Sequence, residues 1–167
     1  MTLTYYTNYS LRTMVYLGLH GSSLASISQI SEAFRISRNH LIKVVHNLAK
    51  QGFIKTTRGR GGGLRLARDP KDINIGDVVR KTEANFNLVE CFDVGRNTCP
   101  LSPVCELKTI VREAEMAFLS VLDRYTLSDL LVKRKQMSAL LKIVYNRQNP
   151  LWLGACNGRR QLAQQRA

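Results

Sequence analysis

The stretch SRNHLIKVVHNLAKQGFIKTTRGRGGGLRLAR, residues 37–68, decides the fold of this chain. Ser37 is a preferred helix N-cap and Gly52 readily takes the left-handed conformation that ends many helices, so a helix is predicted between them. Residues 53–57 and 64–67 are predicted as short strands, because the glycines between them permit the positive φ angles of a tight turn. The stretch therefore predicts a helix followed by a β-hairpin.

The helix in this stretch has one apolar side and one basic, polar side. Leu41, Val44, Val45 and Leu48 recur at helical spacing and are expected to face the core. The opposite side contains cationic, imidazole and amide groups and no acidic residue, which suits contacts with phosphates and base edges of DNA. The predicted DNA-binding residues on the helix and hairpin are Ser37, Arg38, Asn39, His40, Lys43, Lys50, Arg58, Arg60 and Arg65.

Two helices are predicted before this one, over residues 9–20 and from Ser26 as a cap to residue 34. Two helices joined by a turn and followed by a basic hairpin form the winged helix-turn-helix pattern. In that fold the recognition helix enters the major groove and a wing arginine reaches the narrow minor groove. The fold class predicted is mainly α with a small β-hairpin wing.

The charge of the chain is unevenly distributed. The chain has 25 Lys and Arg against 12 Asp and Glu, for a net charge of +13. Residues 1–68 contain a single acidic residue, Glu32, residues 69–132 are net acidic, and residues 133–167 are basic without any acid. A basic N-terminal unit beside an acidic middle predicts that the N-terminal unit binds double-stranded DNA.

Beyond the hairpin, Asn74 is expected to cap a helix over residues 75–82, and a longer helix is predicted over residues 104–125. Apolar residues in this long helix alternate at steps of three and four, which is the a/d pattern of a coiled coil. This seam consists of Val104, Leu107, Val111, Ala114, Phe118, Val121 and Tyr125. An ordinary core helix is the alternative, but pairing with a second copy is favoured because the chain has little other mass to cover it.

Three of the four cysteines, Cys91, Cys99 and Cys105, lie in the loop-like stretch CFDVGRNTCPLSPVC. The chain has no secretory signal pattern and no apolar run near the roughly 18 residues of a membrane span, so we expect a cytoplasmic protein without a membrane partner. Thiols stay reduced in the cytosol, and clustered cysteines there indicate metal or redox chemistry more often than disulfides.

Several of these segments together resemble a known family. TNYSLRTMVYL, SRNHLIKVVHNLAKQGFI, RGRGGGLRLAR, INIGDVVR, the three cysteines and FLSVLDRYTLSDL resemble the NsrR/IscR/RirA family of iron–sulfur winged-helix transcription regulators, from residue 3 to about residue 131. The resemblance implies a homodimer that reads a palindromic operator, with one cluster per subunit near the base of the long dimerisation helix. The recognition helix resembles the nitric-oxide-sensing members most closely.

The same resemblance implies that Cys91, Cys99 and Cys105 hold an iron–sulfur cluster, with a 4Fe–4S cluster favoured over a 2Fe–2S cluster. Soft thiolates suit iron in such clusters. Zinc is the main chemical rival, but it usually prefers CxxC pairs, which this sequence lacks. Thiols without a metal are the remaining alternative.

The fourth ligand is where the sequence departs from the nitric-oxide-sensing members, which tend to have an Asp at the position of Asn8. The iron-sensing members share the Asn and the wide gap between the first two cysteines. Water, Asn8, Asp93, Glu90 and a bound small molecule all stay open as the fourth ligand. Cys156 is interpreted as a spare thiol.

The predicted function is a cytoplasmic dimeric repressor that loses operator affinity when nitric oxide nitrosylates its cluster. An iron-responsive or redox-responsive regulator is the alternative, and a small redox or cluster-carrier protein without DNA binding is a third hypothesis. An enzyme is not expected, since no catalytic arrangement of Ser, His and Asp is evident. The expected divisions are residues 1–83 for the winged domain, 84–105 for the cluster loop, 104–132 for the dimerisation helix and a short following helix, and 133–167 for a partly disordered basic segment.

Overall fold

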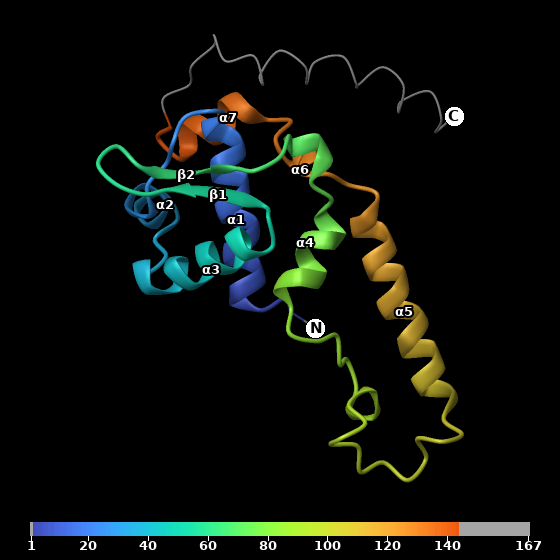
Figure 1. Ribbon diagram of the computed structural model, residues 1–167. Coiled ribbons are helices and arrows are strands. Elements are labelled where there is room, and N and C mark those ends of the chain that lie inside the picture. Colours follow the sequence, from blue (N-terminus) through green and yellow to red (C-terminus); the bar gives the residue numbers. More distant parts are fainter. Residues whose placement is uncertain (1, 144–167) are drawn as a thin grey trace, which may run out of the picture.

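The structure, a computed structural model, describes residues 2–143 (Figure 1). In chain order its elements are α1 (Tyr5–His20), α2 (Ile27–Phe34), α3 (Arg38–Lys50), β1 (Ile54–Thr57), β2 (Gly63–Leu66), the 3-10 turn η1 (Pro70–Asp72), α4 (Ile75–Thr82), the 3-10 turn η2 (Glu90–Phe92), α5 (Glu106–Asp123), α6 (Leu127–Leu130) and α7 (Arg134–Leu140). Within residues 2–143 no helix combines the length and apolar character needed to cross a membrane.

The first three helices begin at side-chain caps. The Thr4 hydroxyl accepts a hydrogen bond from the Thr7 amide, so α1 begins at Tyr5, earlier than the predicted start at residue 9. Ser26 forms a capping box with Gln29, and the Ser37 hydroxyl accepts from the His40 amide, as expected for the predicted starts of α2 and α3. Local hydrogen bonding therefore fixes where the helix-turn-helix begins.

The hairpin pairs antiparallel, with Ile54 opposite Leu66 and Thr57 opposite Gly63. Its turn contains Gly59 and Gly61 at φ values of 94° and 80°, which side chains with a Cβ rarely adopt. Leu64 also exchanges two backbone hydrogen bonds with Ala25, in the connection between α1 and α2. β2 is thus attached to the helical domain near the turn end of the hairpin, and the turn itself projects from the domain (Figure 1).

A single apolar core lies under α1, α3 and the hairpin. α1 contributes Met14, Leu17 and Leu19, all at most 1% exposed. The side of α3 predicted to face inward does so, since Leu41, Val44, Val45 and Leu48 are all buried. Burial of these side chains holds the recognition helix rigidly against α1, with its polar side outward.

α4 and α5 lie side by side and are joined by a bidentate ion pair. The Arg80 guanidinium donates to both carboxylate oxygens of Asp123, at 2.5 and 2.6 Å, which lowers the pKa of the Asp123 carboxyl. The two helices approach closely at Gly76, where an added Cβ would collide with Asp123 and lie 2.8 Å from Arg80. A side chain at position 76 would therefore have to displace the ends of the Asp123 and Arg80 side chains.

After α5 the chain returns to the winged domain. Leu127 and Leu131 are at most 1% exposed, and both belong to the same core cluster as α1. Leu127 also donates its amide to the Ile73 carbonyl at 2.8 Å. The segment predicted as a partly disordered basic tail begins with α7, and its part beyond residue 143, including Cys156, lies outside the described residues.

α5 is the long helix that the heptad pattern predicts, and none of its residues is buried within the described chain. Leu119 and Leu122 pack against the core, whereas Leu107 and Ile110 are 62% and 61% exposed. Five of the seven predicted seam residues are exposed, namely Val104, Leu107, Ala114, Val121 and Tyr125, whereas Val111 and Phe118 are half-buried. Ile110, which the pattern omits, is also exposed. We define the α5 apolar face as Leu107, Ile110, Ala114 and Val121, all of which are exposed.

Candidate DNA-binding surface and cysteine loop

The predicted DNA-binding residues of α3 all lie on its exposed side. Ser37, at the cap, and Arg38, Asn39, His40, Lys43 and Lys50 are exposed. Asn47, on the same side, is half-buried, and its amide donates to the Lys81 carbonyl at 3.4 Å. The surface open to DNA therefore includes the first turns and the C-terminal lysine of α3, while Asn47 links α3 to α4.

The wing extends this basic surface. Arg58 and Arg60 are exposed in the turn of the hairpin, and Arg65 is exposed on β2. The base of the wing is held by Phe53, which is fully buried and has the Arg68 and Lys81 charges 5.0 and 5.1 Å from its ring centroid. The arginines at the tip are thus presented on a firmly attached hairpin, as minor-groove contact requires.

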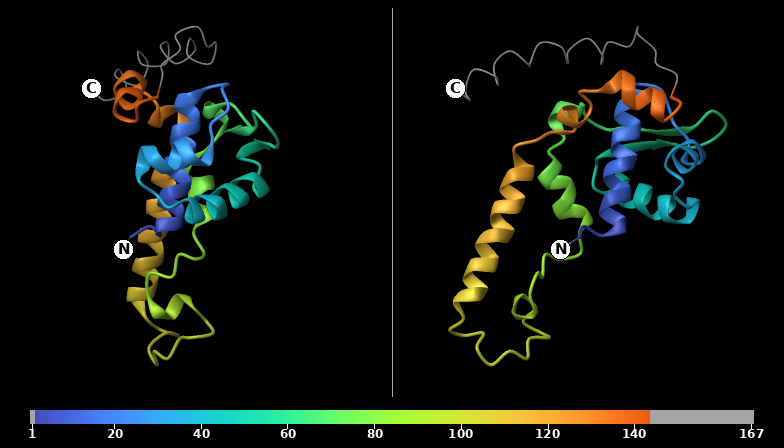
Figure 2. Two further views of the ribbon diagram at one scale, coloured as in Figure 1. Left: turned by 90° about the vertical axis from the view of Figure 1, so that its left-hand side faces the viewer. Right: turned by 180° about the vertical axis from the view of Figure 1, so that it is seen from behind.

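The cysteine loop, residues 89–105, joins the α4 side of the molecule to the start of α5. Cys91, Cys99 and Cys105 are free thiols of intermediate exposure. Two views place this loop beyond the end of α4, apart from α1 (Figures 1 and 2). Cys105 is the N-cap residue of α5, at the base of the long helix, and the role of the three thiols as cluster ligands stays a prediction.

Short-range hydrogen bonds give this loop its shape. The Glu90 carboxylate accepts from the Thr98 amide at 2.5 Å and from the Thr98 hydroxyl at 2.7 Å. These bonds lower the pKa of the Glu90 carboxyl. The side-chain carbonyl oxygen of Asn97 accepts a hydrogen bond from the Cys99 amide at 3.1 Å. Together these bonds fold the segment between Cys91 and Cys99 back toward Glu90.

Phe92 attaches the cysteine loop to α5. Its ring is 9% exposed, and the Arg112 guanidinium carbon lies 3.9 Å from the ring centroid. Arg112 also donates to the Glu115 carboxylate at 3.0 Å, which fixes the guanidinium on the helix. A cation over an aromatic face is attracted by the ring quadrupole, so the residue next to Cys91 is held by a specific contact.

The thiols fit an iron–sulfur cluster by chemistry and by sequence position. All three are reduced, partly shielded and on one loop without strand geometry. Within residues 2–143, however, no three His, Cys, Asp or Glu side chains lie close enough together to hold a metal ion. The loop must therefore close further for three sulfurs to share one cluster.

The candidates for a fourth ligand lie in different places. Asn8 is exposed on α1, and α1 lies apart from the cysteine loop of the same chain (Figure 1). Glu90 is engaged by Thr98, and the Asp93 carboxylate accepts from the Gly95 amide at 3.1 Å. The structure brings none of these together with the three thiols, so the identity of the fourth ligand stays a prediction.

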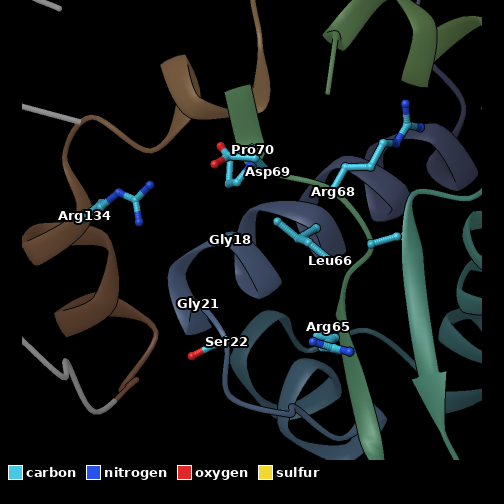
Figure 3. Close-up of a pocket in the computed structure, with 10 residues that line it drawn as sticks. Gly18, Gly21, Ser22, Arg65, Leu66, Arg68, Asp69, Pro70 and Arg134 are labelled. Carbon is cyan, nitrogen blue, oxygen red and sulfur yellow. The ribbon is translucent and has the colours of Figure 1, made fainter. Parts of the chain in front are cut away.

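A cavity of about 220 Å³ lies elsewhere, between α1, the strand β2 and the start of α7. Gly18, Asp69 and Arg134 are among its lining residues, and the Arg134 side chain projects from α7 toward Asp69 (Figure 3). Of the predicted site residues only Arg65 lines it. This cavity is therefore separate from the thiols and from the exposed side of α3.

Sequence reasoning missed two contacts of the site: Phe92 with Arg112, and Tyr9 with His40, whose ring centroids are 6.0 Å apart. The first joins residues from a loop and a distant helix, for which a single sequence carries no signal. The second joins two different helices, and the sequence shows only that Tyr5 and Tyr9, one helical turn apart, share a face of α1.

Comparison with known proteins identifies the family. The family model for Rrf2, described as iron-dependent transcriptional regulators, matches residues 3–133. The HTH-type transcriptional regulator NsrR of Bacillus subtilis (strain 168) is 53% identical over 144 residues, which are 86% of this chain and 99% of that protein. NsrR of Geobacillus kaustophilus (strain HTA426) is 52% identical over 143 residues, which are 85% of this chain and 97% of that protein.

Solved structures agree with this result. IscR of T. potens superposes with a TM-score of 0.66 at 26% identity, covering 81% of this chain and 90% of that chain. CymR, the global cysteine regulator of B. subtilis, superposes with a TM-score of 0.61 at 26% identity, covering 78% and 95%. These neighbours confirm the predicted mainly α fold with a hairpin wing, and the relatives are transcriptional regulators rather than enzymes, as expected. With its fold, its exposed recognition helix and a family match over most of its length, this chain belongs to the Rrf2 family of iron-dependent transcriptional regulators.

Proposed function

We propose that this regulator is a dimeric repressor whose affinity for a palindromic operator falls when nitric oxide reacts with an iron–sulfur cluster held by Cys91, Cys99 and Cys105. The observation that carries the proposal is the placement of three reduced thiols on one short loop that leads directly into α5. Resemblance of the recognition helix to the nitric-oxide-sensing members supports the choice of effector.

The DNA-binding part of the proposal rests on α3 and the wing. The exposed groups of the first turns, Arg38, Asn39 and His40, meet base edges in the major groove. Lys50 and Arg58 neutralise phosphates, which makes binding dependent on salt. Each subunit then reads one half-site of the operator.

The dimer rests on the α5 apolar face. Leu107 and Ile110 are more than half exposed in the single chain, and both are large aliphatic side chains whose burial would be favourable. Two copies of this face in contact form a symmetric interface, which matches the symmetry of a palindrome. The two recognition helices must then lie about 34 Å apart to enter successive major grooves.

The cysteine loop is suited to a switch because it is held by few contacts outside itself. The hydrogen bonds that the Glu90 and Asn97 side chains accept are local, and Phe92 is a buried apolar side chain of the loop. Segments with little buried apolar surface rearrange at low free-energy cost. A bound cluster supplies a redox-active, thiolate-held iron centre, and the protein supplies the three thiolates and the contact of Phe92 with α5.

An iron-responsive or redox-responsive regulator is the second candidate, and two observations favour it. Asn8 stands where a carboxylate would be expected for the nitric-oxide-sensing type, and an amide oxygen is the weaker ligand for iron. The matching family is itself described as iron-dependent.

One titration separates the two candidates. The full chain is purified and reconstituted without oxygen, and its optical and resonance spectra are followed with stepwise additions of nitric oxide while operator binding is measured in parallel. Nitric oxide sensing predicts loss of operator binding in proportion to loss of the cluster spectrum. If operator binding is unchanged by nitric oxide but falls when iron is chelated, the second candidate is the function.

A further inference from the structure

One large apolar side chain lies on the polar side of the recognition helix. Ile42 is 51% exposed, whereas Leu41, Val44, Val45 and Leu48 of the same helix are buried. The helical pattern assigns DNA contacts to the polar residues of this side and leaves Ile42 without a role.

The neighbours of Ile42 on the helix surface are polar. Residues three and four apart lie next to each other on a helix, which places Arg38, Asn39 and His46 around Ile42. All three are exposed, and the sequence of α3 contains no acidic residue. An isolated aliphatic group thus lies among groups suited to phosphates and base edges.

Ile42 lies on the side of α3 that faces away from α1. A helix turns by about 100° per residue, so Ile42 is nearly opposite to His40 and Val44, each two residues away. The His40 ring contacts Tyr9 of α1, and Val44 is fully buried. The Ile42 side chain is therefore not needed to hold α3 against α1.

Helix formation does not favour isoleucine at this position either. A β-branched residue forms helices less readily than Ala, Leu, Lys or Arg, any of which an exposed site would accept. Single exposed apolar residues are common on protein surfaces and by themselves mark nothing. Ile42 differs from them by its place in the second turn of α3, directly after Arg38 and Asn39 and along the outer edge of the winged domain (Figure 1).

The major groove of DNA offers one apolar group to such a side chain. Hydrogen-bond donors and acceptors line the edges of all four bases, and the C5-methyl group of thymine is the exception. An aliphatic side chain pressed against a donor or acceptor removes its water without replacing the hydrogen bond. Contact with a methyl group instead removes apolar surface of both partners from water, so Ile42 fits a thymine better than any other base.

We propose that Ile42 reads the C5-methyl group of a thymine in each half-site of the operator. This inference rests on the major-groove binding of α3 in the proposed function and adds a base-specific contact made without a hydrogen bond. Arg38 and Asn39 select bases through hydrogen bonds, and Ile42 selects a nearby base pair through apolar contact.

Removal of the methyl group from the DNA tests this contact. An operator is selected from a random duplex pool with the full-length, cluster-reconstituted chain, and each thymine is then replaced singly by deoxyuridine, which keeps the base pair. We expect a thymine in each half-site at which this replacement lowers affinity about fourfold, the factor for one methylene-sized group removed from water. A C·G pair at that place should weaken binding, and 5-methylcytosine should restore part of the loss.

Variants of the protein assign the methyl contact to Ile42. Ile42→Ala should bind the thymine and deoxyuridine operators equally well, because the shorter side chain does not reach the methyl group, while Ile42→Val should keep most of the difference. Arg58→Ala is the control for weakened binding in general, since it should bind both operators less tightly at an unchanged ratio. A ratio that stays at the wild-type value in Ile42→Ala would overturn the inference.

The outcomes also distinguish this inference from the function on which it rests. The measurements use no nitric oxide, so a chain that does not respond to nitric oxide still gives a result for the methyl group. A preferred operator at which no deoxyuridine replacement lowers affinity would overturn this inference alone. A random pool that yields no preferred sequence would overturn both this inference and the proposed repressor.

Discussion

The guanidinium carbon of Arg112 lies 3.9 Å from the centroid of the Phe92 ring. This contact joins the residue beside Cys91 to the helix that carries the α5 apolar face. Arg112 is held in turn by Glu115 at 3.0 Å. Phe92, Arg112 and Glu115 thus connect the cysteine loop to α5. A conformational change in the loop therefore alters the surroundings of Arg112 on α5.

Replacing Arg112 with Ala should loosen the cysteine loop without unfolding the protein, because the contact lies outside the core. We expect faster amide hydrogen exchange across residues 91–105 and lower cluster occupancy after reconstitution, while circular dichroism is unchanged. Arg96→Ala is the control, since Arg96 has only a 3.9 Å ion pair with Asp93 and its side chain is 88% exposed. Equal exchange in both variants would show that Arg112 does not hold the loop.

Replacing Arg38 or Asn39 with Ala should weaken operator binding by roughly 1–3 kcal/mol and relax sequence preference, because these side chains meet base edges. Replacing Lys50 or Arg58 should instead weaken binding to all DNA and flatten its salt dependence. Fluorescence anisotropy with operator and scrambled DNA over a salt series separates the two effects. Unaltered affinity and selectivity of Arg38→Ala would refute the placement of α3 in the groove.

Replacing Ile110 with Asp should produce monomers, since a carboxylate buried in an apolar interface is strongly unfavourable. Met116→Asp is a close control, because Met116 is 59% exposed against 61% for Ile110 and lies on another side of α5. Analytical ultracentrifugation should find the first variant monomeric and the second dimeric. Two dimeric variants would place the subunit contact elsewhere.

Replacing Gly76 with Ala should lower the Tm by at most about 2–4 °C, because the new methyl group displaces the exposed Arg80–Asp123 pair between α4 and α5. Gly95→Ala provides the comparison, since its Cβ would meet only Asp93 at an ordinary 3.6 Å. Thermal unfolding should give a lower Tm for the first variant alone. Identical midpoints would mean that the two helices separate without cost.

The parts of the structure that sequence predicts best are those with local signals. Ser26 and Asn74 mark the starts of α2 and α4, because a cap bonds to an amide two or three residues away. Burial of Leu41 and Leu48 follows from helical periodicity alone.

The parts that sequence does not predict depend on distant contacts. The exposure of Ile110 depends on the orientation of α5 about its own axis where it packs on α4. A heptad pattern in the sequence does not predict that orientation. The place of Tyr6 against Lys43 likewise depends on the packing of α1 on α3. The sequence likewise predicts that Cys91, Cys99 and Cys105 share one loop, but not whether that loop brings three ligand side chains together, which it does not within residues 2–143.

The central claim is that a cluster on the cysteine loop maintains the DNA-binding state. The most direct measurement is the operator Kd of Cys99→Ala against the reconstituted wild type, with Cys156→Ala as the control thiol. The account predicts that Cys99→Ala lacks the cluster colour and binds the operator weakly at unchanged helix content, while Cys156→Ala matches the wild type. Operator binding by Cys99→Ala as tight as that of the reconstituted wild type would contradict it.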